Sequence, residues 1–108
     1  MSENKIFGTA LDPAKLVSPQ EGSIVSRIIV DGKAGNVTVF AFDKGQRLSE
    51  HTAPFDALVQ ILEGESAVTI DGKDHIVKTG EWIVMPANIP HSLRADKPFK
   101  MSLVMIKK

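Results

Sequence analysis

Residues Gly45–Gly64 read GQRLSEHTAPFDALVQILEG, and a second segment further along the chain, Gly80–His91, reads GEWIVMPANIPH. In the first segment a turn glycine leads into His51, a proline-containing loop, an apolar run and another glycine. In the second segment a turn glycine leads into an apolar run, a proline and then His91. A glycine turn, a strand, a loop and a histidine therefore occur twice, which predicts a β fold with a weak internal two-fold repeat.

The sequence on either side of these segments also has the pattern of short strands. Asp71-Gly72 is a strong two-residue hairpin signal, because type I′ turns need a positive φ at both central positions. No amphipathic helix of normal length interrupts the pattern, and such a chain is typical of an all-β sandwich or barrel, with the jelly roll as the eight-strand solution. Strands are expected over residues 24–30, 37–42, 47–52, 57–62, 66–70, 75–78, 82–85, 91–95 and 99–106.

The N-terminal segment, residues 1–22, reads as an arm that precedes a barrel domain over residues 23–108. Pro13 and Pro19 interrupt any long helix, so the arm is expected to form at most one helical turn, capped by Asp12. Three apolar residues should pack either on the barrel or on a partner subunit: Leu11, Leu16 and Val17.

Composition excludes several classes of function. The chain has 108 residues, with 13 basic and 13 acidic side chains interspersed, so it lacks the basic stripe that nucleic-acid binding needs. No apolar window is long enough to span a membrane, and the first residues lack the apolar core of a signal peptide. Zero cysteines exclude disulfides, thiolate metal sites and a cysteine nucleophile. We therefore expect a cytoplasmic protein without nucleic-acid or membrane partners.

The two segments resemble the paired motifs of a small single-domain cupin of the conserved-barrel, RmlC-like type. The first motif is matched by Gly45, five residues, His51 and later Gly64, and the second by Gly80, five residues, Pro86 and then His91. The resemblance covers roughly residues 37 to 106. It implies a double-stranded β-helix, or jelly-roll barrel.

The resemblance also implies a metal site, but the motifs are depleted. The second histidine of the family's first motif falls on Ala53, and its metal-binding glutamate falls on Ala57. The glycine of the second motif falls on Asn88, which tolerates a positive φ better than most residues. Two of the four usual ligands remain, His51 and His91.

Two imidazoles alone hold a metal weakly. Catalytic zinc takes at least three protein ligands, and non-haem iron oxygenases use two histidines and one carboxylate. Asp56, next to the vacated glutamate position, is one candidate for a third ligand. Gln60 is the other, although strand alternation from Ala57 places it on the opposite face. The incomplete ligand set favours a pair of hydrogen-bonded pocket histidines without metal; the alternative is one divalent Fe, Mn, Ni, Cu or Zn ion.

Replacing a histidine and a glutamate by alanine enlarges the cavity and makes it more apolar. Ala53, Phe55, Ala57 and Met85 are therefore expected to line a pocket around the two histidines. A small-molecule binder, with or without metal, is the first hypothesis. A metal-dependent dioxygenase, isomerase or decarboxylase is the second. The third is a non-catalytic structural module, and a homodimer is expected in any case because small cupins often pair through sheet faces.

Overall fold

The computed structural model describes residues 6–107, which form nine β-strands and one short 3₁₀ helix, as the all-β prediction requires. The bounds are η1 Pro13–Lys15, β1 Ile24–Gly32, β2 Gly35–Phe42, β3 Arg47–His51, β4 Phe55–Glu63, β5 Glu65–Ile70, β6 Lys73–Lys78, β7 Trp82–Met85, β8 His91–Arg94 and β9 Phe99–Lys107.

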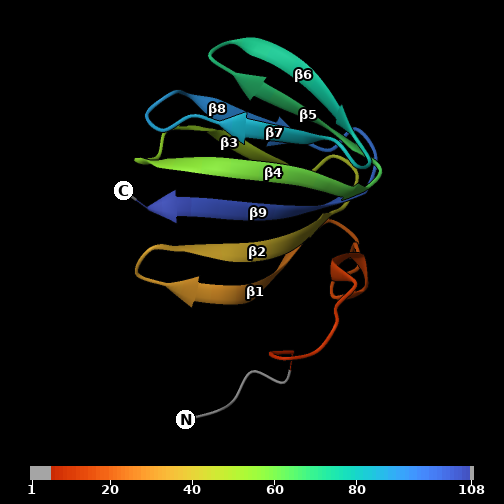
Figure 1. The fold of residues 1–108 in the computed structure, drawn as a ribbon. Coiled ribbons are helices and arrows are strands. Elements are labelled where there is room, and N and C mark those ends of the chain that lie inside the picture. The colour runs from red at the N-terminus through yellow and green to blue at the C-terminus, as the bar shows by residue number, and fades with distance from the viewer. Residues whose placement is uncertain (1–5, 108) are drawn as a thin grey trace.

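The strands form two antiparallel sheets that pack face to face as a jelly-roll barrel (Figure 1). One sheet has the order β1-β2-β9-β4-β7, and the other has the order β3-β8-β5-β6. Strands far apart in sequence are neighbours: β9 lies between β2 and β4, and β8 lies between β3 and β5. This order brings β3 and β8, the strands that carry the two motif histidines, side by side.

The core is built from residues that alternate along the strands. In β4, Ala57, Val59 and Ile61 are buried while the residues between them are half-buried. At the centre, Phe42 of β2 and Phe99 of β9 stack with ring centroids 4.5 Å apart. Period-two alternation thus assigns one face of each strand to the interior, as expected for a sheet with one packed face.

The start of β4 differs from the expected strand over residues 57–62. The strand begins at Phe55, because Phe55 and Asp56 pair with Lys107 and Ile106 at the end of β9. Pro54 immediately before it cannot donate to the ladder, so the strand starts after the proline. Asp56 therefore belongs to the strand and not to the preceding proline-containing loop, and strand alternation sets the direction of its side chain.

The turns have the backbone conformations that their sequences predict. Asp71 and Gly72, between β5 and β6, have φ values of 50° and 79°, as a type I′ turn requires. Asn88, at the motif position usually held by glycine, has φ 65°. Asparagine therefore substitutes for glycine here without changing the turn.

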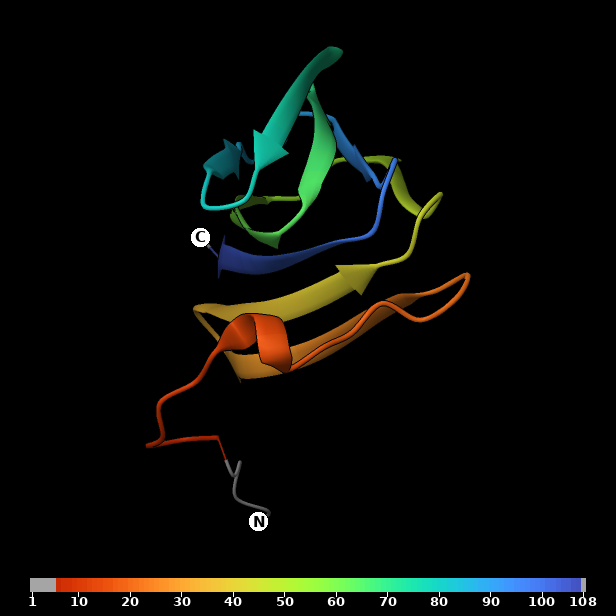
Figure 2. The same ribbon diagram turned by 90° about the vertical axis from the view of Figure 1, so that its right-hand side faces the viewer.

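The N-terminal arm packs on the outer face of the five-stranded sheet (Figure 2). η1 is capped by the Asp12 side chain, which accepts a hydrogen bond from the Ala14 amide. Val17 is buried against Val39 and Ala41. The Lys100 ammonium donates to the Ala14 carbonyl at 2.7 Å, which ties the arm to β9. Leu16 and Val17 thus pack on the chain's own barrel, whereas Leu11, which was also expected to pack, is 40% exposed.

A different part of the same outer face is left uncovered by the arm. Trp82 and Val84 of β7 and Ile106 of β9 are 62%, 54% and 54% exposed. The strand β4 lies between these two strands, so the three side chains are exposed on one sheet face without being direct neighbours. Within residues 6–107, no helix has both the length and the apolarity that a membrane crossing demands.

Gly64, which closes the first motif, is predicted to be intolerant of a side chain. Its φ is 79°, and an added Cβ would lie 2.8 Å from the Pro98 carbonyl oxygen. Gly45 has a similar φ, 85°, but nothing within 4 Å of an added Cβ. Both alanine variants should lose about 1–2 kcal/mol from the left-handed backbone, and Gly64→Ala should lose more because Pro98 must move. Urea unfolding of the two variants measures the difference, and equal losses would contradict the prediction.

Candidate functional site

The two motif histidines meet across neighbouring strands. His51 ends β3, His91 begins β8, and the two are register partners. Their ring centroids are 4.4 Å apart in an edge-on arrangement. His91 is only 4% exposed, whereas His51 is exposed, so the pair runs from the barrel interior to its mouth.

Each imidazole is held by a local hydrogen bond to backbone. His51 Nδ1 lies 2.8 Å from the Ser49 carbonyl oxygen, and His91 Nδ1 lies 3.1 Å from the Ile89 carbonyl oxygen. A carbonyl oxygen only accepts, so Nδ1 carries the proton in both rings. In the neutral imidazoles the lone pair is therefore on Nε2, where it can accept a hydrogen bond or bind a metal.

A cavity of about 60 Å³ lies beside the pair. Its walls come from both sheets and are almost wholly apolar apart from the imidazoles. The four residues expected from the sequence, Ala53, Phe55, Ala57 and Met85, all line it. Met101 and Met105 line it too; their position on apolar strands predicts mainly core packing, with one or two such residues at a pocket mouth. Alternation along β9 gives their inward direction, but only the pairing of β9 with β4 places them at the cavity.

Two hydrogen bonds join the loop before β8 to the first motif, one to a backbone carbonyl and one to a side chain of β4. The Asn88 amide donates to the Ala53 carbonyl at 2.8 Å, and the Ala87 amide donates to the Asp56 carboxylate at 2.9 Å. Asp56 thus supports the loop that leads into His91. The second motif is thereby fixed to the first at the point where the cavity opens.

The structure does not bring either candidate third ligand to the histidines. Asp56 and Gln60 lie on the half-buried face of β4, opposite the face of Ala57. The Gln60 carbonyl oxygen accepts from the Ser102 hydroxyl at 3.4 Å. Among the residues that the structure describes, no cluster of three or more His, Cys, Asp and Glu side chains can hold a metal. The candidate nitrogen ligands are therefore His51 and His91, and within residues 6–107 no carboxylate completes a group of three with them.

The third histidine, His75, lies in β6 at the edge of the four-stranded sheet and is exposed, as its position after the hairpin predicts. It pairs with Val68 in β5 and does not line the cavity beside the other two histidines. His75 therefore serves as a matched control for substitutions at those two positions.

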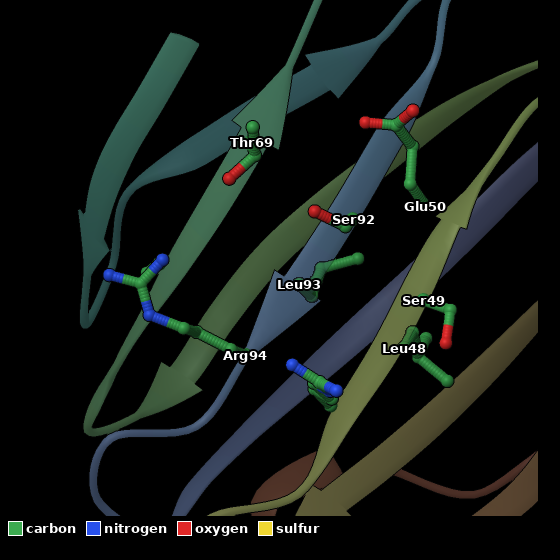
Figure 3. A pocket seen from close by; sticks show the side chains of 9 residues that line it. Leu48, Ser49, Glu50, Thr69, Ser92, Leu93 and Arg94 are labelled. Carbon is green, nitrogen blue, oxygen red and sulfur yellow. The ribbon is translucent and has the colours of Figure 1, made fainter. Parts of the chain in front are cut away.

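A larger hollow of about 330 Å³ lies on the same four-stranded sheet that carries the two histidines, where Ser92 and Arg94 of β8 sit between β3 and β5 (Figure 3). The Arg94 guanidinium is already paired, with Asp74 at 3.5 Å and Asp96 at 3.3 Å. The Thr69 hydroxyl, aided by Arg94, holds the pKa of Asp74 below its ordinary value. Glu50 adds a further carboxylate to the lining. Arg47 is the second cationic side chain of the lining.

Comparison with known proteins agrees with this architecture. A cupin domain model matches residues 38–107. A conserved protein of unknown function from Streptococcus pyogenes is 40% identical, with a TM-score of 0.89 over 94% of this chain and 89% of that chain. A cupin 2 conserved barrel domain protein from Leptotrichia buccalis is 46% identical, with a TM-score of 0.84 over 87% of this chain and 46% of that chain.

A more distant structure has the same fold. The salicylate 1,2-dioxygenase of Pseudaminobacter salicylatoxidans is 19% identical, with a TM-score of 0.71 over 77% of this chain and 26% of that chain. No curated protein matches the sequence. Because the domain model spans most of the chain and the barrel and both motifs agree with it, the chain belongs to the cupin family.

Proposed function

We propose that this cupin binds a small hydroxyl-bearing molecule in the cavity beside His51 and His91. The observation that carries the proposal is the fixed orientation of the two rings. Both Nδ1 atoms are engaged by backbone carbonyls, at 2.8 Å and 3.1 Å, so both Nε2 atoms are available as acceptors. A ligand that satisfies them must supply a donor, such as O–H, or a metal ion.

The size of the cavity limits what can enter. An engineered apolar cavity of about 150 Å³ accepts benzene, whereas this cavity measures about 60 Å³. We therefore infer that only the hydroxyl-bearing end of a ligand enters. The remainder lies at the mouth, beside exposed His51 and half-buried Phe55.

The lining favours an aromatic body behind the hydroxyl. Phe55 can stack on an aromatic ring, and thioether sulfur makes favourable contacts with ring edges. Met85 and Met105 provide such sulfur atoms in the cavity wall. Phenols are thus the ligand class with the best fit to the site. The dioxygenase, isomerase and decarboxylase alternatives need a third metal ligand that no described carboxylate provides.

Phenol and anisole form a matched pair of probes, because anisole has the ring without the donor. Wild type is expected to bind phenol about tenfold more tightly than anisole, because the net free energy of one hydrogen bond corresponds to roughly that ratio of dissociation constants. Titration followed by NMR of the imidazole resonances measures both affinities. His51→Ala should reduce the preference, because one of the two Nε2 acceptors is lost, and since His51 is exposed the fold should survive.

His75→Ala, at the exposed β6 edge of the four-stranded sheet and outside the cavity lining, is the control and should keep the wild-type preference. Equal affinity of wild type for phenol and anisole would sink the proposal. So would a phenol preference that His51→Ala leaves intact.

A further inference from the structure

The cavity carries an unusual concentration of thioether groups. Three of the four methionines in the sequence, Met85, Met101 and Met105, line it together with His51 and His91. Met85 and Met101 are 3% and 0% exposed. Buried methionine often serves only to fill space, so the argument depends on where each sulfur-bearing side chain lies relative to the imidazoles.

Two of the three methionines flank a single position. Met85 of β7 and Met105 of β9 are both register partners of Ala57 in β4. Directly paired residues on one face of a sheet have Cβ atoms about 4.5–5.5 Å apart. Ala57 is the position at which the cupin motif has its metal-binding glutamate. At Ala57, where the resemblance places the glutamate, two methionines are therefore the neighbours on the adjacent strands. All three residues line the same cavity as the two imidazoles.

The donor set that results is neutral and soft. It consists of two imidazole Nε2 lone pairs and thioether sulfur, with no Asp or Glu completing a cluster among residues 6–107. Carboxylate-rich sites suit harder divalent cations, whereas thioether and imidazole ligands suit Cu(I). Desolvation in an apolar cavity also disfavours a divalent ion without a carboxylate, because the cost rises steeply with uncompensated charge. The residues present therefore fit a monovalent soft cation and fit Fe(II), Mn(II) and Zn(II) poorly.

We propose that the cavity is a Cu(I) site, formed by Nε2 of His51, Nε2 of His91 and the thioether of Met85 or Met105. This inference goes beyond the proposed function, because it assigns a different occupant, a metal ion, to the same nitrogen lone pairs. A phenol hydroxyl and Cu(I) compete for those lone pairs. Saturating Cu(I) should therefore lower the apparent affinity for phenol.

The test is an anaerobic titration of the full chain with Cu(I), using bicinchoninate as a competing chromogenic chelator. Wild type should bind one Cu(I) per chain, with an affinity at least about 100-fold greater than for Mn(II). The double variant Met85→Leu/Met105→Leu removes both flanking sulfur atoms with little change in volume. Its Cu(I) affinity should fall at least about tenfold.

His75→Ala is the control. His75 is exposed in β6 and does not line the cavity, so its replacement should leave Cu(I) affinity unchanged. Copper X-ray absorption of the wild-type complex should show a sulfur ligand that is missing from the double variant. Thermal melts of the apo forms confirm that each variant folds.

Two results would overturn the Cu(I) site: unchanged Cu(I) affinity in the double variant, or a wild-type complex without a sulfur ligand. Failure here is distinguishable from failure of the proposed function. If metal-free protein binds phenol in preference to anisole while Cu(I) is not bound, the Cu(I) inference alone is wrong. If Cu(I) binds through sulfur and phenol shows no preference, the Cu(I) site stands and the small-molecule proposal is wrong.

Discussion

An Ala57→Glu variant is expected to bind Mn(II) at least about 100-fold more tightly than wild type, and to do so with a gain in stability on metal binding. Ala57 lines the same cavity as His51 and His91, so a glutamate there would add a carboxylate to the two imidazoles. Two histidines and one carboxylate are the minimal set that harder divalent ions accept. The variant thus tests whether the missing carboxylate is what separates this site from a metal-binding cupin site.

The same substitution should destabilise the metal-free protein. Ala57 is 5% exposed, and its strand neighbours on that face, Met85 and Met105, offer no hydrogen-bond donor to a carboxylate. Burial of an unpaired carboxyl should cost about 2–4 kcal/mol. Mn(II) at about 100 times its dissociation constant should restore about 2.7 kcal/mol, because it binds only the folded state.

Ala57→Gln is the matched control, since glutamine has the size of glutamate without its charge. Metal titration by calorimetry and thermal unfolding with and without Mn(II) give the two readouts. If Ala57→Glu and Ala57→Gln bind Mn(II) equally, the carboxylate is not the determinant, and the prediction is wrong.

Removal of the central aromatic pair should have the largest effect on stability. Phe42 and Phe99 are 0% and 1% exposed, and their rings stack at 4.5 Å with an interplanar angle of 15°. Phe42→Ala should cost about 3–5 kcal/mol, because it removes buried apolar area and leaves a cavity that the rigid strands cannot close. For a domain of this length, that loss is a large fraction of the total stability.

Urea unfolding of Phe42→Ala, Phe99→Ala and the double variant measures both the losses and their coupling. The stacked pair should show a coupling energy of about 0.5–1.5 kcal/mol. Phe7→Ala is the control, because Phe7 is 60% exposed and should change stability little. A loss in Phe42→Ala no greater than in Phe7→Ala would contradict the assignment of this pair as the centre of the core.

The features that the sequence predicts well are those set by local interactions. The Asp71-Gly72 turn follows from the backbone freedom of two adjacent residues, and its positive φ values are those expected. The cap of η1 by Asp12 also depends on residues next to one another. The strands likewise appear at nearly their expected positions, since alternation and turn residues act over a few residues.

The candidate site depends on contacts between distant parts of the chain, and here the sequence is less informative. The motif spacing predicts that His51 and His91 lie close together. Whether Asp56 can be a third ligand depends on the face of β4 on which its side chain lies. Pairing with β9 extends β4 back to Phe55 and directs Asp56 to the Ala87 amide. The residues next to Asp56 in the sequence do not predict that β4 pairs with β9 at this point.

By itself, then, the sequence determined the all-β class, the turns, the capped N-terminal turn and the pair of glycine–histidine segments typical of a cupin barrel. Only the tertiary structure decided that Met85 and Met105 flank Ala57, and that no carboxylate joins the two imidazoles among the described residues. The physical reason is strand register. Alternation states which face a side chain occupies, but the residue opposite it is chosen by hydrogen bonding to a strand tens of residues away.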